Sequence, residues 1–158
     1  MSDSHDNWEN LEKAVELANS NGCSFLMFAG DLIAPSGIPI LEKFNSKGKF
    51  VWGNNEGERM GITRKLDASP KIDLCGDLFE GEIDGIKIFM CHSPRIAELA
   101  AKSGEFDLCI YGHTHKYKEQ KIGNCILVNP GAIQDYKTGK PCFAVFDTDT
   151  SKINRISL

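Results

Sequence analysis

The sequence of 158 residues contains no apolar run near the roughly 18 residues that a membrane-spanning helix needs. Its N-terminus lacks the basic region and apolar segment of a secretory signal. Acidic residues outnumber basic ones, and the formal net charge of -4 gives no general attraction to nucleic acid or to an anionic membrane. We therefore expect a cytoplasmic protein with no membrane contact and no general nucleic-acid binding.

The six cysteines include no CxxC pair. This absence argues against a thiolate zinc site, and the scattered positions argue against the disulfide framework of a small secreted domain. Most of the cysteines lie within apolar runs, which predicts reduced, buried thiols. Cys91 is the one that could support a functional site, because it adjoins His92.

The composition is that of an ordinary globular domain, with 41% hydrophobic and 25% charged residues and no obvious repeat or low-complexity tract. Its length suits a single domain over residues 1–158. Apolar spacing predicts an amphipathic helix over Trp8–Asn21, and the apolar run Cys23–Ala29 predicts a strand buried on both faces.

Further helices are predicted over Ile38–Phe44, Glu56–Leu66 and Arg95–Ser103. Further strands are predicted over Lys49–Trp52, Leu78–Asp84, Ile86–Cys91, Phe106–Tyr111, Lys118–Ile122, Cys125–Asn129, Cys142–Asp147 and Lys152–Ser157. Helices and strands alternate early and strands dominate late, which predicts a layered α/β domain with more than one sheet.

All four histidines fall in short polar segments that can supply metal ligands. These segments are Asp3-Ser4-His5, Gly30-Asp31, Gly53-Asn54-Asn55-Glu56, Cys91-His92 and Gly112-His113-Thr114-His115. The last four each follow an apolar run, and α/β sheets gather ligands at strand ends. In the DxH and HxH segments, alternate residues of an extended chain point the same way. Each segment alone is a weak signal, but their joint order predicts a metal site.

The candidate ligands comprise two carboxylates, four imidazoles and one amide, which are too many for one tetrahedral zinc ion and sufficient for two metals that share a carboxylate. The absence of thiolates and the richness in imidazole favour Mn, Fe, Zn, Ni or Co over Ca or Mg. Two divalent ions bring more positive charge than Asp3 and Asp31 remove, so an acidic protein can hold a centre that attracts phosphate.

The order of these segments resembles that of the calcineurin-like metallophosphoesterases, and more closely the small phosphodiesterases of the group that also contains the retromer subunit Vps29. The resemblance spans nearly the whole chain. It is carried by Ser2-Asp3-Ser4-His5-Asp6-Asn7, Gly30-Asp31, Gly53-Asn54-Asn55-Glu56-Gly57-Glu58-Arg59, His92, Gly112-His113-Thr114-His115 and Asn129-Pro130-Gly131-Ala132.

The resemblance implies a four-layer α/β/β/α sandwich of two mixed sheets with a dinuclear site. One metal would be surrounded by Asp3, His5, Asp31 and His115. The other would be surrounded by Asp31, Asn54, His92 and His113. Asp31 would be the bridge, and a hydroxide held between the metals would attack phosphorus in line.

The implied function is a metal-dependent phosphodiesterase acting on a small phosphate ester, with Asp31, Asn54 and His92 as the catalytic residues. We expect two Mn²⁺ ions, with Ni²⁺, Zn²⁺, Fe²⁺ or Co²⁺ as alternatives. The alternative function is a binding scaffold that keeps this fold without turnover, as the likeness to Vps29 allows.

Two positions depart from the family pattern. Many relatives have a histidine after the GN asparagine, where this chain has Asn55, and asparagine cannot act as a general acid near neutral pH. We therefore expect a preference for esters with good leaving groups, or an acid supplied by water or another side chain.

The second departure is at the start, because relatives place an apolar strand before the DxH segment, whereas only Met1 and Ser2 precede Asp3. Losing about five buried apolar side chains at roughly 1.5 to 3 kcal/mol each would cost on the order of 10 kcal/mol. That is comparable to the whole stability of a typical domain. We expect that the natural chain begins upstream or that another segment fills the gap, and that Asp3 and His5 are the least securely placed ligands.

Overall fold

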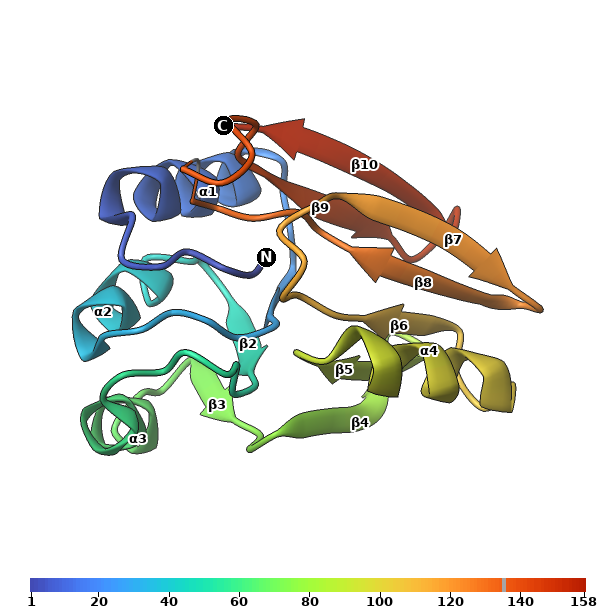
Figure 1. Ribbon diagram of the computed structural model, residues 1–158, viewed down its shortest axis with the longest axis horizontal. Coiled ribbons are helices and arrows are strands. Elements are labelled where there is room, and N and C mark those ends of the chain that lie inside the picture. Colours follow the sequence, from blue (N-terminus) through green and yellow to red (C-terminus); the bar gives the residue numbers. More distant parts are fainter. Residues whose placement is uncertain (135) are drawn as a thin grey trace.

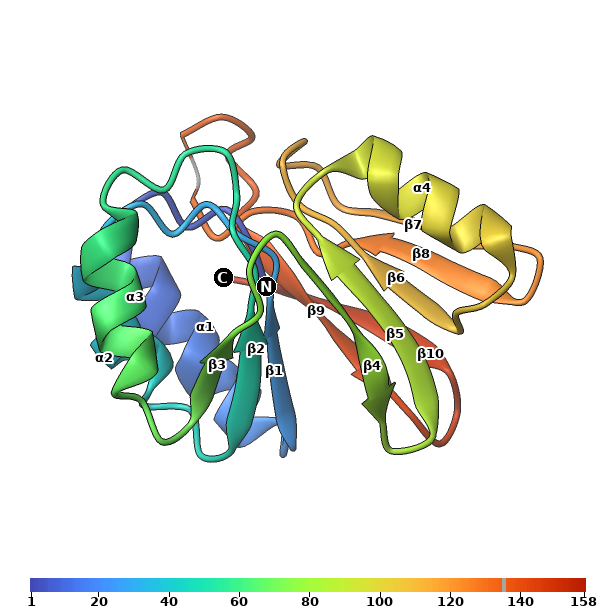
Figure 2. The ribbon, with the colours of Figure 1, turned by 90° about the horizontal axis from the view of Figure 1, so that it is seen from below.

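The computed structural model describes residues 1–134 and 136–158. Two layers of strands face each other, with helices on both outer sides (Figures 1 and 2). The first sheet is parallel, has the strand order β1-β2-β3, and comprises β1 (Phe25–Phe28), β2 (Lys47–Phe50) and β3 (Ile72–Leu74).

The second sheet has five strands in the order β4-β5-β6-β8-β7. Its central strands β5, β6 and β8 are parallel, whereas β4 and β7 pair antiparallel at the two edges. The bounds are β4 (Leu78–Ile83), β5 (Ile86–Cys91), β6 (Leu108–Ile110), β7 (Lys118–Ile122) and β8 (Cys125–Asn129).

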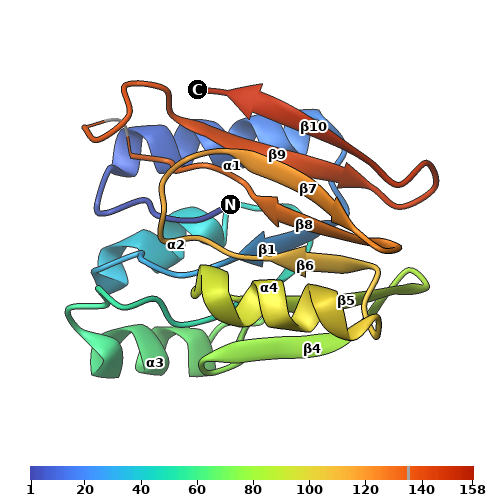
Figure 3. The same cartoon turned by 45° about the vertical axis from the view of Figure 1, so that its right-hand side comes forward.

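The last two strands, β9 (Cys142–Asp147) and β10 (Lys152–Ser157), form an antiparallel hairpin that is a separate two-stranded sheet (Figure 3). Phe143 and Val145 of β9 pack in the core beneath α1, and Ala144 and Phe146 pack in the core between the two layers. The hairpin therefore has one face toward the helices and the other toward the second sheet.

Helices α1 (Trp8–Ser20), α2 (Ile38–Leu41) and α3 (Arg59–Asp67) cover the first layer, and a short 3₁₀ turn, η1 (Pro35–Gly37), precedes α2. Helix α4 (Pro94–Ser103) covers the second sheet, where Ala97 and Ala101 pack against Phe89 and Cys109. The structure confirms the α/β/β/α sandwich. No helix within the described residues is long and apolar enough to cross a membrane.

The predicted elements are found, with small shifts at their ends. Helix α3 begins at Arg59 and not at Glu56, because the Glu56 side chain accepts hydrogen bonds from the backbone N–H groups of Asp31 and Leu32. Strand β3 is not predicted from the sequence, since its three residues are too few to show a pattern.

The N-terminal segment does not fray. Ala29 N–H donates to the Met1 carbonyl, and Asp3 N–H donates to the Gly30 carbonyl. On the other side, the carbonyls of Ser2 and Asp3 accept from the N–H groups of Ile133 and Gln134 at 3.1 Å each. Asp3 is fully buried, so the expectation of a poorly positioned residue is wrong at this position.

The core beneath the helices depends on stacked aromatic rings from adjacent strands. Phe28 of β1 and Phe50 of β2 are both fully buried, and their rings stack with centroids 5.4 Å apart. Replacing Phe50 with alanine is expected to lower the free energy of unfolding by about 3 to 5 kcal/mol, because it removes this packing and leaves a cavity.

Urea denaturation would measure this change. Met60→Ala in α3 is the control, since Met60 is 68% exposed and its loss is expected to change the free energy of unfolding by less than about 0.5 kcal/mol. Equal effects of the two substitutions would contradict the assignment of Phe50 to the core.

Candidate metal centre

The predicted ligands lie on loops at the carboxyl ends of strands from both sheets. Asp31 follows β1, Asn54 follows β2 and His92 follows β5, while His113 and His115 follow β6. Parallel strands end at the same edge of a sheet, so these loops meet. The N-terminal segment adds Asp3 and His5, because its hydrogen bonds to Gly30 and Asp31 place it beside the loop after β1.

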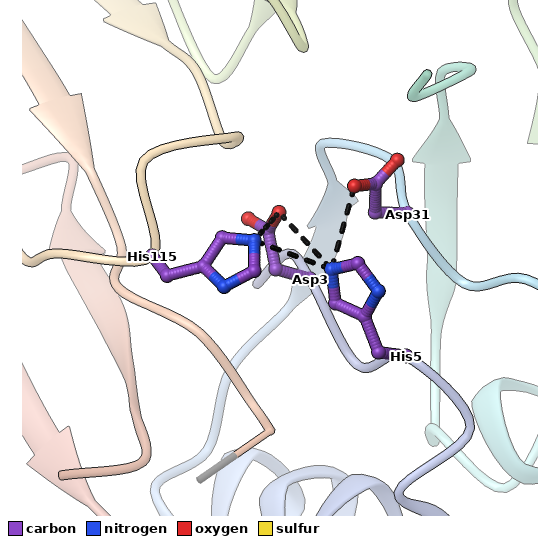
Figure 4. Close-up of side chains that lie close together, drawn as sticks. All are labelled: Asp3, His5, Asp31 and His115. Atoms are coloured by element: carbon purple, nitrogen blue, oxygen red, sulfur yellow. Dashed lines mark hydrogen bonds and ion pairs between the residues drawn. The ribbon is translucent and has the colours of Figure 1, made fainter. Parts of the chain in front are cut away.

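Four of the predicted ligands form one compact group. Ligand atoms of Asp3, His5, Asp31 and His115 all lie within 4.8 Å of one another (Figure 4). His115 Nε2 is 3.2 Å from Asp3 Oδ1 and 3.2 Å from His5 Nε2. This group of carboxylate oxygens and imidazole nitrogens could hold a metal ion.

The other predicted ligands form a second group beside the first. His92 and His113 have ring centroids 5.3 Å apart, and His113 Nδ1 lies 2.8 Å from Asn54 Oδ1. Both Asn54 and His113 are exposed, whereas His92 is buried. The structure thus brings the seven residues together as two adjoining groups.

Asp31 belongs to both groups through a single atom. Its Oδ2 lies 3.4 Å from Nε2 of His5 and 3.4 Å from Nε2 of His92. This oxygen therefore faces one imidazole of each group.

The tautomer of His92 suits a metal ligand. Its Nδ1 lies 2.7 Å from the Ala29 carbonyl, so this nitrogen carries the proton and donates, which leaves Nε2 with a lone pair. The buried Nε2 has no hydrogen-bond partner among the described residues, although it faces the Asp31 carboxylate. A lone pair next to a carboxylate is unfavourable unless a proton or a metal ion lies there, so the donor set fits a divalent metal.

The electrostatics of the two ligand groups also favour a bound cation. Burial acts most strongly on Asp3 and tends to raise its pKa, but hydrogen bonds from His115, His5 and Ser2 outweigh it and lower the pKa. The pKa of Asp31 is likewise lowered, because the neighbouring His92 imidazole and the hydrogen bonds from Asn55 outweigh the effect of burial. Burial tends to lower the pKa of His92, but the nearby Asp31 carboxylate and the Ala29 carbonyl outweigh burial and raise the pKa.

Five of the seven predicted ligands have left-handed backbones. Their φ angles are 56° at Asp3, 44° at His5, 61° at Asp31, 69° at His113 and 61° at His115. Such conformations are costly for residues other than glycine and persist where the surroundings fix them, often at functional sites. The DxH and HxH segments are therefore not extended, which corrects the alternation argument made from the sequence.

Two site residues that sequence reasoning did not assign hold Asp31 in place. Asn55 donates from its backbone N–H to Oδ1 and from its side-chain amide to Oδ2, each at 2.8 Å. Glu56 accepts from the Asp31 N–H at 2.7 Å. Both residues lie in the motif segment after β2, but nothing in the sequence indicates which way their side chains turn.

Gln134 and Asn129 hold the GHTH loop. The buried Gln134 amide contacts His115 Nδ1, which leaves Nε2 toward Asp3. The Asn129 amide donates to the Gly112 carbonyl at 2.7 Å and to Thr114 Oγ1 at 3.0 Å. The Asn129-Pro130-Gly131 segment therefore borders the site, and Gly131 has a positive φ of 86°.

Tyr136 lies at the rim of the site, whereas the Cys91 side chain points away from it. Tyr136 is 65% exposed, and its ring meets His5 edge-on with centroids 5.9 Å apart, so it lies at the rim. Cys91 turns away, since its thiol donates to the Ser93 carbonyl and the residue packs in the core beneath α4. Burial raises the pKa of the Cys91 thiol to about 11.

Comparison with known proteins identifies the family of this chain. The model of the calcineurin-like phosphoesterase superfamily domain matches residues 1–151. The chain belongs to that superfamily. It is 32% identical over 160 residues to a phosphodiesterase of Methanocaldococcus jannaschii, an alignment that covers 100% of this chain and 96% of the relative.

Two further matches are to a phosphodiesterase and to Vps29, the two kinds of protein named in the resemblance above. The solved structure of an archaeal phosphodiesterase matches with a TM-score of 0.92 and 32% identity, covering 100% of this chain and 97% of that one. Vacuolar protein sorting-associated protein 29 of Schizosaccharomyces pombe is 27% identical over 138 residues, or 87% of this chain and 68% of the relative. The family resemblance stated from the motifs is confirmed.

The GN loop offers a matched pair of substitutions. A Cβ added at Gly53 would lie 2.1 Å from Asp31 Oδ1, whereas one added at Gly57 would meet its nearest neighbour at an ordinary 3.6 Å. Gly53→Ala is therefore expected to displace Asp31 and weaken divalent-metal binding by at least about tenfold. Tenfold is the lower end of the loss in metal affinity when a residue that positions a metal ligand is replaced.

Isothermal titration with Mn²⁺ would compare the variants, and Gly57→Ala should bind as the parent does. Unchanged metal affinity in Gly53→Ala would argue against Asp31 as a ligand, provided that circular dichroism shows both variants to be folded.

Proposed function

We propose that this protein is a metal-dependent phosphodiesterase with a dinuclear centre. The observation that carries the proposal is the position of Asp31 Oδ2, at 3.4 Å from an imidazole nitrogen of each ligand group. The family and the archaeal phosphodiesterase relative support the reaction class.

The ligand assignment follows from the two groups. Asp3, His5 and His115 would hold one ion, while Asn54, His92 and His113 would hold the other, and Asp31 would contact both. We expect Mn²⁺, with Ni²⁺, Zn²⁺, Fe²⁺ or Co²⁺ as alternatives, because the donors are imidazole and carboxylate. When bound, two such ions lower the pKa of water and neutralise charge on a phosphoryl group.

The protein's own residues would position these ligands. The Ala29 carbonyl fixes the orientation of His92, Gln134 fixes that of His115, and Asn55 holds both oxygens of Asp31. Such preorganisation lets the ligands bind and act without rearrangement. A small phosphate ester is the substrate class that fits, since the ligand groups lie on loops with Asn54 and His113 exposed.

A non-catalytic scaffold is less well supported. A binding protein derived from this fold would have no need of a complete ligand set, yet all seven predicted residues are present and adjacent. The five left-handed ligand backbones are also a cost that a scaffold would not need to keep.

Asp31→Asn is expected to reduce Mn²⁺-dependent hydrolysis of bis(p-nitrophenyl) phosphate by more than about 100-fold, because even residues behind a metal ligand contribute 10- to 100-fold. Asparagine tolerates the left-handed backbone at this position, so the substitution removes the charge without adding strain.

Asp73→Asn is the control for this substitution, since Asp73 forms an ion pair with Lys49 at the surface. Release of p-nitrophenol would be followed at saturating Mn²⁺. Full activity of Asp31→Asn, or no activity of the parent with any of the five metals, would remove the proposal.

Asn55 predicts a dependence on the leaving group. Its amide donates to Asp31, and it cannot supply a proton to a departing alkoxide near neutral pH. The rate for the parent should therefore fall steeply as the leaving-group pKa rises.

Asn55→His is expected to raise the rate for alkyl esters by at least about tenfold relative to aryl esters, given the 10²- to 10⁴-fold typical of general acids. Asn55→Gln serves as the control and should keep the steep dependence. A flat dependence for the parent, with chemistry shown to be rate-limiting by viscosity independence, would contradict this explanation.

A further inference from the structure

A cavity of about 400 Å³ lies on the outer face of the second sheet, between α4 and the edge strand β7. Helix α4 contributes Pro94 and Glu98 to its wall, and β7 contributes Lys118 and Gln120. Leu127 of β8, which packs in the core beneath α4, also lines it. The volume falls within the range of small-molecule binding sites.

The cavity adjoins the candidate metal centre through the GHTH loop. Thr114 and Lys116 line the cavity, and they alternate along the chain with the predicted ligands His113 and His115. Consecutive Cα atoms are about 3.8 Å apart, so the wall of the cavity begins one residue from each of these ligands. A molecule that extends from the metal centre over this loop would enter the cavity.

The hydroxyl of Tyr111 indicates that the cavity takes a ligand. Tyr111 lines the cavity and is only 5% exposed, because its ring packs in the core beneath α4. The hydroxyl makes no hydrogen bond to any residue in the described part of the chain. Polar groups of buried side chains almost always have a partner, and a phenol is a donor near neutral pH. This donor is therefore available to a molecule in the cavity.

The charged side chains of the cavity favour an anion. Lys116 and Lys118 line it and form no ion pair within residues 1–134 and 136–158. Glu98, a carboxylate in the wall, forms an ion pair with Lys102 on the same helix. Lys102 also contributes most to the lowered pKa of Glu98, and Lys118 contributes less. The two lysines of the cavity wall thus have positive charge to offer to a ligand.

A phosphate monoester is the anion that this set of donors fits. Near neutral pH it carries a charge of about -1.5 to -2 and has three acceptor oxygens, whereas a carboxylate has a single charge and two oxygens. Two ammonium groups match that charge, and the Tyr111 hydroxyl and the Gln120 amide add donors. Thr114 Oγ1 accepts from the Asn129 amide at 3.0 Å, so the proton of the Thr114 hydroxyl can be donated to the ligand.

We propose that this cavity is a second subsite of the phosphodiesterase, and that it binds a phosphate monoester carried on one alcohol arm of the substrate. The inference rests on the proposed function, because the reacting diester lies at the metal centre while the second phosphate lies beyond the GHTH loop. The substrate class is thus a phosphodiester with a terminal phosphate, and not a diester of two uncharged alcohols.

Binding of glycerol 3-phosphate tests the subsite without hydrolysis. The compound is titrated into the protein in the presence of EDTA, and chemical shift changes are expected at the amides of Thr114 and Lys118. Replacing Lys116 and Lys118 together with glutamine is expected to weaken binding at least about tenfold, because both charges that face the phosphate are lost. The control replaces Lys13 and Lys121, which are exposed outside the cavity, and removes the same charge.

Tyr111→Phe removes only the hydroxyl. It is expected to weaken binding of glycerol 3-phosphate at least about threefold without lowering the melting temperature, because the hydroxyl has no partner among the described residues. Glycerate, in which a carboxylate replaces the phosphate, should bind more weakly. Equal binding of the two compounds would overturn the assignment to phosphate. Equal affinity of the parent and the double lysine variant would overturn the subsite and indicate an adventitious ion only.

Two p-nitrophenyl diesters of glycerol connect the subsite to the proposed reaction. They differ only in whether the far hydroxyl carries a phosphate. The parent with Mn²⁺ is expected to have the higher kcat/KM for the phosphorylated diester, and the double lysine variant should lose at least about tenfold of this preference through a rise in KM.

The kinetic and binding results separate the two proposals. If the parent hydrolyses both diesters with equal kcat/KM, the subsite is overturned while the proposed function stands. If the parent hydrolyses neither, the proposed function fails, and with it the role of the cavity as a subsite, even where glycerol 3-phosphate still binds.

Discussion

The position of the Asp31 carboxylate is the constraint on which the site depends. One of its oxygens faces an imidazole from the N-terminal segment and another from the loop after β5. The His5 imidazole lies beside the first sheet and the His92 imidazole follows a strand of the second. The Asp31 carboxylate can contact both only if the carboxyl ends of the strands in the two sheets lie at the same edge of the sandwich. Asn55 donates hydrogen bonds to the Asp31 carboxylate, and the Glu56 carboxylate accepts one from the Asp31 N–H, so both residues fix the position of Asp31.

The parallel strands of both layers produce that alignment. Strands β1, β5 and β6 are largely apolar and end at the same edge, where polar residues follow. The burial that stabilises β1, β2, β5 and β6 therefore also positions the ligand loops. The loops are held by the packed core. Because of this, the site residues remain in strained backbone conformations that an isolated loop would not adopt.

Much of this arrangement could be predicted from the sequence, because strand ends followed by GD, GN and GHTH show both the period of the strands and the chemistry of the ligands. The contacts that orient the ligands could not be predicted from the sequence. The link between Gln134 and His115 and the turn of Asn55 toward Asp31 depend on side-chain directions that no periodic pattern encodes. The burial of Asp3 was missed for a related reason, since the segment that covers it, around Ile133 and Gln134, lies at the other end of the chain.

The left-handed residues within the DxH and GHTH segments have a consequence for protein engineering. Their conformations are imposed by packing and by bonds to partners more than a hundred residues away, such as the donation from the His113 N–H to Asp3. A short peptide with the same sequence would adopt ordinary backbone angles, and its imidazoles would no longer lie in this arrangement. The smallest unit that could be transplanted into another protein with this coordination geometry is thus the whole sandwich.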